Sequence, residues 1–307
     1  MRMAMFLPMA VAIVSLAPTP AASQEFAPGF VEHTTIVEGR TIFYRVGGSG
    51  PTVVLLHGFG DTGDMWAPLA PRLARSYTVI VPDLPGLGQS RPEASTARYD
   101  MASVAVLMHA FMLQIGVRRE AIVAHDIGLM VAYAYAAQFP SEVTKLALMD
   151  APIPGVGPWE QVLLSQATVQ FHFFGKYAEE LTAGRERIYL DHIWDTFAYH
   201  PDRVTGATRT RYAASYAQPG NMHAAFSYFA GFYDDAHDNV SFAKTPLPMP
   251  VLAMGGEKSL GALMPEFAKA VAVNVQTSVI PDAGHWLMDE NASATMDAIV
   301  RFLSSPS

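Results

Sequence analysis

The chain has 307 residues, of which half are hydrophobic and only 16% are charged. This composition provides enough apolar side chains for a large core and excludes a disordered chain. The formal net charge of −8 argues against nucleic acid or an anionic membrane surface as a partner, because both require a basic surface. Cysteine is absent, which excludes disulfides, a thiol nucleophile and thiolate metal sites.

Residues 1–23 have the layout of a secretory signal peptide. Arg2 is the only charged residue before Glu25, an apolar stretch covers residues 6–16, and small residues and prolines follow as far as residue 23. We therefore expect cleavage near Ala22 and a periplasmic or secreted protein. The apolar stretch is too short for a permanent transmembrane helix, and a retained lipophilic anchor is the alternative.

The part of the chain that follows alternates between strand and helix patterns. Glu32–Val37 and Thr41–Arg45 flank a Gly-containing turn and predict an antiparallel hairpin. Short runs rich in Val, Ile and Leu predict buried strands at Thr52–Leu56, Thr78–Val81, Ala121–Ala124, Lys145–Met149, Val251–Met254 and Thr277–Ile280. Helical patterns lie between them at Met101–Ile115, Gly128–Phe139 and Ala292–Phe302. The alternation predicts an α/β fold with a doubly wound, mostly parallel sheet.

The alternation stops between residues 152 and 248. Proline clusters open and close this stretch, which is rich in aromatic residues and contains helical patterns at Glu179–Tyr199 and Arg209–Ala217. We interpret 152–248 as a helical cap domain inserted into a core domain made of 24–151 and 249–307.

Asp126 occupies the position of a nucleophile at a strand-to-helix turn. The strand ends at Ala124, the helix begins near Gly128, and both of these flanking residues are small. A nucleophile elbow requires this spacing, because larger side chains would clash in so tight a turn. A carboxylate there can displace a leaving group at saturated carbon and form an alkyl ester. The alternative is that Asp126 only caps the helix that follows it.

Two further polar residues complete a triad. Asp150 ends the strand Lys145–Met149, and His285 follows the last predicted strand in the sequence Gly284-His285-Trp286. The order nucleophile, acid, histidine is that of the α/β-hydrolase fold. We expect His285 to activate the water that hydrolyses the ester, and Asp150 to orient its imidazole.

The segment from His57 to Gly60 follows a strand directly and predicts an oxyanion hole. The backbone N–H groups of Phe59 and Ile127 would face the carboxylate of Asp126 and stabilise the tetrahedral intermediate of ester hydrolysis. We expect His57 itself to hold the loop and not to take part in the chemistry.

Five segments resemble the epoxide hydrolases of the α/β-hydrolase fold, which include secreted bacterial members. They are His57-Gly58-Phe59-Gly60, Pro82–Ser90, Ala124-His125-Asp126-Ile127-Gly128, Asp150–Pro154 and Gly284-His285-Trp286. The resemblance covers nearly the whole chain after residue 23 and implies an enzyme that converts epoxides to vicinal diols. Many epoxide hydrolases keep their acid where Glu257 stands here, which makes Glu257 an alternative to Asp150.

The resemblance also implies two hydrogen-bond donors on the cap for the departing oxygen. Alignment places Gln170 where relatives have His, with His172 two residues later, and places Phe229 where relatives have Tyr, with Tyr228 adjacent. We take His172 and Tyr228 as the candidate donors, although each could instead be a packing residue of the cap. The remaining pocket candidates are aromatic: Trp66, Phe171, Phe174, Phe229 and Trp286.

Two other functions remain open. A haloalkane or haloacid dehalogenase would use the same triad, but haloalkane dehalogenases usually place Trp where Ile127 stands, and fluoroacetate dehalogenases place Arg just after their Asp. A non-catalytic binding protein would gain nothing from an intact triad. We expect a small apolar epoxide or halide as substrate, no cofactor and no metal, and a homodimer remains possible. The cap histidines lack paired ligand spacing: His192, His200, His223 and His237.

Overall fold

The computed structural model describes residues 26–91 and 97–306. The predicted signal peptide, residues 1–23, lies outside the described residues. Within the described ranges, every helix is too short or too polar to cross a membrane.

Eight strands of the described chain form one sheet, in the order β1-β2-β4-β3-β5-β6-β7-β8. The first two strands form the predicted hairpin, β2 is also antiparallel to β4, and the remaining neighbours are parallel. The strands are β1 (Val31–Val37), β2 (Arg40–Gly48), β3 (Thr52–Leu56), β4 (Thr78–Pro82), β5 (Glu120–His125), β6 (Val143–Met149), β7 (Val251–Gly256) and β8 (Val275–Ile280). Each run that the sequence predicts as a strand is one, and the mostly parallel sheet is confirmed.

Helices cover both faces of this sheet, because its central strands carry apolar side chains on each face. They are η1 (Gly63–Trp66), α1 (Ala70–Leu73), α2 (Met101–Gln114), α3 (Ile127–Gln138), α10 (Met264–Val271), α11 (Leu287–Glu290) and α12 (Ala292–Ser304). The predicted helices match α2, α3 and α12 to within two residues. Helix α3 packs on β5 and β6 and against α2, and its residues from Ile127 to Ala136 are all buried.

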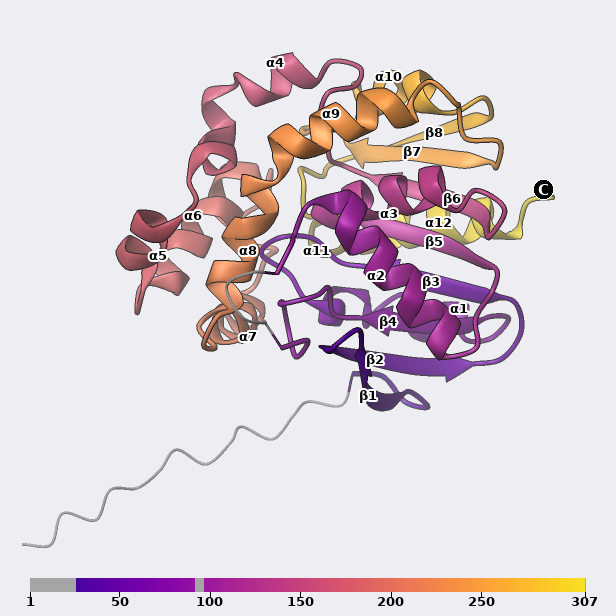
Figure 1. The fold of residues 1–307 in the computed structure, drawn as a ribbon, viewed down its shortest axis with the longest axis horizontal. Coiled ribbons are helices and arrows are strands. Elements are labelled where there is room, and N and C mark those ends of the chain that lie inside the picture. The colour runs from indigo at the N-terminus through magenta and orange to yellow at the C-terminus, as the bar shows by residue number, and fades with distance from the viewer. Residues whose placement is uncertain (1–25, 92–96, 307) are drawn as a thin grey trace, which may run out of the picture.

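Seven further helical segments lie between β6 and β7, within the stretch interpreted as a cap. They are α4 (Trp159–Leu163), η2 (Gln166–His172), α5 (Lys176–Thr182), α6 (Glu186–Phe197), α7 (Gly206–Tyr216), α8 (Asn221–Ala230) and α9 (Phe232–Phe242). Figure 1 shows α4 to α8 gathered at one end of the sheet, with α9 leading back toward β7. The single helix predicted over Glu179–Tyr199 is wrong, because Gly184 adopts a φ of +72° that a right-handed helix does not permit, and this separates α5 from α6.

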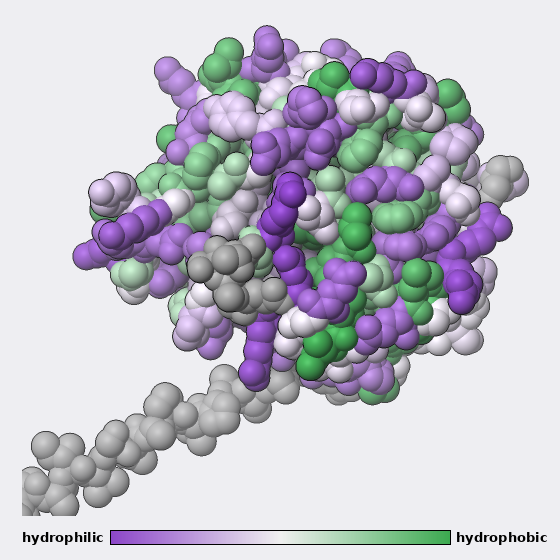
Figure 2. Space-filling model, in the orientation of Figure 1, coloured by the Kyte–Doolittle hydropathy of each residue, from purple (hydrophilic) through white to green (hydrophobic). Residues whose placement is uncertain are grey.

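The surface in Figure 2 mixes hydrophilic residues with smaller hydrophobic areas. Several of the exposed large apolar side chains belong to the helices inserted between β6 and β7: Leu164, Val169, Tyr177, Leu181 and Ile188. The parallel strands end at one edge of the sheet, beneath these helices, and that edge is where ligands bind in open α/β sheets.

Candidate active site

Asp126 stands at a strained turn between β5 and α3. Its backbone has a φ of +51° and a ψ of −126°, which is rare for a residue with a side chain. The chain passes so close to the preceding loop that a Cβ on Gly128 would lie 2.4 Å from the carbonyl oxygen of His57. A Cβ on Gly58 would lie 2.6 Å from the Cβ of Asp126. Glycine is therefore required at both positions: the elbow predicts a small residue at 128, and Gly58 is required by the loop that packs on the turn.

The Asp126 carboxylate contacts two groups that the sequence singles out. The backbone N–H of Phe59 donates to Oδ1 at 2.8 Å, and Nε2 of His285 lies 3.6 Å from Oδ2. The side chain is 15% exposed, so it is accessible from the cavity that it faces. The second oxyanion donor, the N–H of Ile127, stays a prediction. His57 holds the loop as expected, since Nε2 accepts from the N–H of Leu84 and Nδ1 donates to the carbonyl of Gly58.

Of the two candidates for the acid of the triad, Asp150 contacts His285 and Glu257 does not. Nδ1 of His285 donates to Oδ2 of Asp150 at 3.1 Å, while the N–H of Leu260 donates to Oδ1 at 3.0 Å. Asp150 is fully buried and follows β6 with a φ of +51°, as Asp126 follows β5. Glu257 lies at the surface, where its hydrogen bond from Lys258 lowers its pKa.

The charges around His285 favour its protonated form. Burial lowers its pKa, but the hydrogen bond to Asp150 and the negative charges of Asp126 and Asp150 outweigh this and raise the pKa to about 9. Any event that neutralises Asp126 removes one of these causes and lowers the pKa again. Loss of the negative charge on Asp126 would therefore favour neutral His285, the form that can accept a proton.

A cavity of about 320 Å³ opens in front of Asp126. Its apolar wall consists of Phe59, Pro152, Val162, Ala167, Phe171, Ile193, Phe197, Phe229, Leu260, Leu263 and Trp286. Its polar lining, besides the triad, consists of Gln161, Ser165, Thr168, Gln170, Thr196, Lys258 and Ser259. The volume suits a small organic molecule, and the lining is mainly apolar with a few polar groups.

The structure places three of the five predicted pocket residues at this cavity. Phe171, Phe229 and Trp286 line it, but Trp66 and Phe174 do not. Trp66 is fully buried on η1, which packs on β3 and β4, so it belongs to the core of the sheet domain. Phe174 packs against the hydrophobic core from beyond the end of η2.

Neither predicted leaving-group donor lines the cavity, and both predictions need correction. His172 is exposed, and its Nε2 donates to the carbonyl of Leu163 at 3.3 Å. Tyr228 is fully buried, and its hydroxyl donates to the carbonyl of Pro85 at 3.0 Å. Neighbouring helix positions point in different directions, so the inward positions belong instead to Gln170 on η2 and Phe229 on α8.

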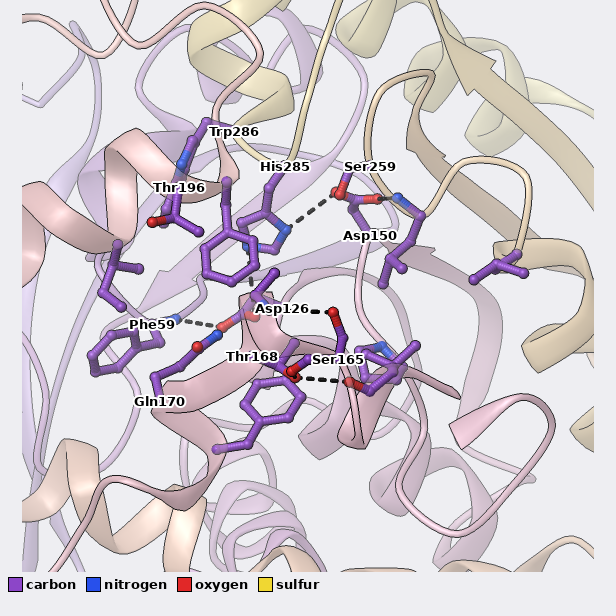
Figure 3. A pocket seen from close by; sticks show the side chains of 18 of the residues that line it. Phe59, Asp126, Asp150, Ser165, Thr168, Gln170, Thr196, Ser259, His285 and Trp286 are labelled. Atoms are coloured by element: carbon purple, nitrogen blue, oxygen red, sulfur yellow. Dashed lines mark hydrogen bonds and ion pairs between the residues drawn. The ribbon is translucent and has the colours of Figure 1, made fainter. Parts of the chain in front are cut away.

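Gln170 is the polar residue that reaches toward Asp126 from the inserted helices. It is 6% exposed, its Oε1 is buried without a hydrogen-bond partner, and Figure 3 shows its amide extending toward Asp126. The sequence contains a signal for it, because alignment places Gln170 at the position of the donor His in relatives.

Comparison with known proteins agrees with this architecture. A family model described as the alpha/beta hydrolase fold matches residues 51–292. The chain is 27% identical over 280 residues to a soluble epoxide hydrolase of Corynebacterium sp. (strain C12), covering 89% of this chain and 96% of that protein. It is 28% identical over 289 residues to a fluoroacetate dehalogenase of Burkholderia sp, covering 90% and 94%. Among solved structures, the Cif epoxide hydrolase from Acinetobacter nosocomialis superimposes with a TM-score of 0.83 at 26% identity, covering 90% of each chain.

Proposed function

The chain belongs to the α/β-hydrolase fold family, and we propose that it hydrolyses small neutral electrophiles, epoxides first among them, through a covalent ester on Asp126. One observation carries the proposal. A carboxylate occupies the strained elbow between the N–H of Phe59 and the His285–Asp150 pair, and it faces a mainly apolar cavity.

In the first step, a carboxylate oxygen of Asp126 attacks a saturated carbon of the substrate. The new carbon–oxygen bond forms as the bond to the leaving group breaks, and the leaving group carries away the electron pair. The Gln170 amide is placed to hydrogen-bond the departing atom. This step consumes the negative charge of Asp126, so the pKa of His285 falls from its raised value of about 9.

In the second step, His285 acts as general base through Nε2. It removes a proton from a water molecule, which attacks the carbonyl carbon of the Asp126 ester. The oxyanion forms on the oxygen that accepts from Phe59, and Asp150 stabilises the imidazolium of His285. Collapse of the tetrahedral intermediate breaks the bond to the alkyl ester oxygen, which takes the proton from the His285 imidazolium and leaves as the alcohol. The carboxyl group of Asp126 then loses the remaining proton of the water to solvent and becomes a carboxylate again.

Epoxides are favoured by the neutral lining and by ring strain. The cavity offers no unpaired positive charge within the described residues, since the Lys258 ammonium forms an ion pair with Glu257. An uncharged substrate therefore fits better than a haloacid. The strain of a three-membered ring assists carbon–oxygen cleavage, and the Gln170 amide can stabilise the developing alkoxide by a hydrogen bond. Relatives described as epoxide hydrolases support the same class.

Alkyl halides are the second candidate, on one specific observation. The polar side chains that the inserted helices place at the cavity are amides and hydroxyls, and none of these described residues is a cap Tyr or His that could supply a proton. A halide leaves without a proton, whereas an alkoxide needs one. The relative described as a fluoroacetate dehalogenase supports displacement of a halide on the same scaffold.

Trapping the ester in a His285→Gln variant tests the function and separates the two substrate classes. Because ester hydrolysis stops in this variant, incubation with styrene oxide should add a hydroxyalkyl group to the peptide containing Asp126. Incubation with 1-bromobutane instead should add a butyl group if halides are accepted. Mass spectrometry distinguishes the adducts. Unmodified Asp126 after exposure to a broad panel of both classes would contradict the covalent mechanism.

Export belongs to the same proposal. Its support is the layout of residues 1–23, with one charge, an apolar stretch and small residues before residue 24. Expression of the full chain in a Gram-negative host should yield a periplasmic or extracellular protein that begins near residue 24. N-terminal sequencing of the purified protein checks this, and an intact residue 1 would contradict it. The homodimer stays a prediction.

A further inference from the structure

A second pair of imidazole and carboxylate lies behind the catalytic histidine. The side chains of His125 and Asp61 are each 1% exposed, and Nδ1 of His125 lies 3.6 Å from Oδ2 of Asp61. The ring of His125 packs beside that of His285, with centroids 4.5 Å apart. The proposed reaction uses neither residue.

One hydrogen bond of His125 fixes a hydrogen on Nε2. Nε2 lies 2.9 Å from the carbonyl oxygen of His285, and because a carbonyl only accepts, Nε2 must carry the hydrogen. A neutral His125 would then direct the lone pair of Nδ1 at the buried carboxylate of Asp61, and the two would repel each other. A proton on Nδ1 or on Asp61 would remove this repulsion, across a separation of 3.6 Å.

The surroundings of Asp61 support a shared proton. Both of its carboxylate oxygens and Nδ1 of His125 are buried, and within the described chain none of the three atoms has a hydrogen-bond partner. A fully ionised Asp61 without a cation would be costly in such a place, and sharing a proton with His125 removes that cost.

The pair connects three loops that carry the proposed chemistry. Asp61 lies two residues after the oxyanion donor Phe59, and His125 immediately precedes the nucleophile. The His125 ring reaches the backbone of His285, whose carbonyl also accepts from the N–H of Leu287 and whose own N–H donates to the carbonyl of Phe197.

The loop that carries Asp61 is also fixed from the inserted helices. The hydroxyl of Tyr216 accepts from the N–H of Gly60 at 2.8 Å and donates to the carbonyl of Asp61 at 3.3 Å. Asp61 therefore has little freedom to follow a moving His125, and the position of the ring is determined by a rigid partner.

We propose that Asp61 and His125 are positioning residues, and that their shared proton keeps His125 in the form that holds the backbone of His285 in place. The inference rests on the proposed function, because the position of His285 matters most for ester hydrolysis. The pair should therefore affect the second step of the reaction and leave the first largely intact.

Single-turnover kinetics of His125→Phe test the proposal, with ester formation and ester hydrolysis followed by mass spectrometry of the Asp126 peptide. Ester hydrolysis should slow by about 10- to 100-fold, since a small displacement of a catalytic group has effects of that size, while alkylation changes less than about threefold. His109→Phe is the matched control, because His109 is a partly buried histidine on α2 that pairs with Glu142 away from the cavity. An equal loss in both steps, or no loss, would overturn the proposal.

Two substitutions of Asp61 separate positioning from simple packing. In Asp61→Asn, the amide N–H can donate to Nδ1 of a neutral His125, which keeps the hydrogen on Nε2, so ester hydrolysis should be rescued to within about threefold of wild type. In Asp61→Leu, Nδ1 has no donor, and ester hydrolysis should slow by about tenfold. Equal rates for the two variants would contradict the shared proton.

Nuclear magnetic resonance of the imidazole nitrogens keeps the inference testable if His125→Phe does not fold. With ¹⁵N-histidine labelling, His125 should show a protonated Nε2 and an Nδ1 that is protonated or accepts a strong hydrogen bond. A neutral ring with hydrogen on Nδ1 alone would overturn the proposal. If wild-type protein forms no ester with any electrophile, the proposed function fails, and this spectrum alone decides the role of the pair.

Discussion

The two walls of the cavity differ in how firmly their polar groups are held. On the core wall, Asp126, Asp150 and His285 follow β5, β6 and β8, and each has a hydrogen-bond or charged partner within 3.6 Å. On the wall formed by the inserted helices, Gln170 and Phe229 face the cavity, and Oε1 of Gln170 has no hydrogen-bond partner.

In the proposed function, the residues that carry out the reaction lie on one wall of the cavity, and the residues that select the substrate lie on the other. In the proposed mechanism, the core wall supplies the nucleophile, the base and the oxyanion donor that any substrate needs. The other wall would contact the leaving group, and it offers the amide of Gln170 there instead of an acid. Substitutions on the core wall should therefore affect all substrates alike, whereas substitutions on the opposite wall should change the preference between substrates.

The largest effect is expected for Asp126→Asn. The amide is a poor nucleophile, so turnover of every substrate should fall by about 10³-fold or more. The melting temperature serves as the control for folding, since Asn tolerates a positive φ better than other side chains. Loss of activity toward one substrate class only would contradict a shared nucleophile.

The second prediction concerns pH and stability. The pKa of His285 in the folded protein, about 9, lies above its ordinary value of 6.5. Its stabilising contribution is therefore fully present below pH 6.5 and is lost as the pH rises through about 9, and it amounts to roughly 3 kcal/mol. Chemical denaturation should show the difference in stability between wild type and His285→Gln shrinking across this range. A difference that does not depend on pH would show that the pKa is not raised.

A smaller loss of activity is expected from substitutions of Gln170. These substitutions should affect ester formation and leave ester hydrolysis, which depends on the core wall, unchanged. Gln170→Leu removes the donor to the leaving group and should slow ester formation by about 10- to 100-fold, with ester hydrolysis unchanged. Gln170→His introduces an acid and should raise the rate with epoxides relative to halides. Rapid-quench measurement of the ester distinguishes the steps. If Gln170→Leu slows only ester hydrolysis, the amide does not serve the leaving group.

The smallest effects are expected at the two donors predicted from the sequence alone. Tyr228→Phe removes the hydrogen bond to Pro85 and should cost about 1 kcal/mol of stability, while kcat changes less than about threefold. His172→Ala should change neither, because the side chain is exposed. Steady-state kinetics and thermal unfolding check both. A loss of about 100-fold in kcat for either variant would restore it as a catalytic donor.

The sequence predicts the core wall well for a physical reason. Parallel strands appear as short apolar runs, and the elbow requires small residues at fixed distances from Asp126 because the backbone passes within contact of its neighbours. Each residue of the triad also follows a strand whose end is visible in the sequence. The positions of Asp126, Asp150 and His285 could therefore be predicted without any knowledge of side-chain packing.

The opposite wall could not be predicted in the same way. Whether a side chain on η2 or α8 points inward depends on the rotation of a short helical segment, and one residue of rotation exchanges Tyr228 for Phe229. The segment that contains Gln170 is a 3₁₀ helix with a kink at Thr168, which no periodicity in the sequence reveals. The Asp61–His125 pair is equally hidden, because its residues are 64 positions apart and belong to no motif by residue type.

A single turnover in H₂¹⁸O, with enzyme in excess over styrene oxide or an alkyl halide, tests the ester on Asp126 most directly. If water attacks the ester carbonyl, the first product carries ¹⁶O that comes from Asp126. The Asp126 carboxylate then contains ¹⁸O from the water instead. Mass spectrometry of the Asp126 peptide and of the product measures both. Appearance of ¹⁸O in the first product, with none in Asp126, would contradict the covalent mechanism and indicate direct attack by water on the substrate.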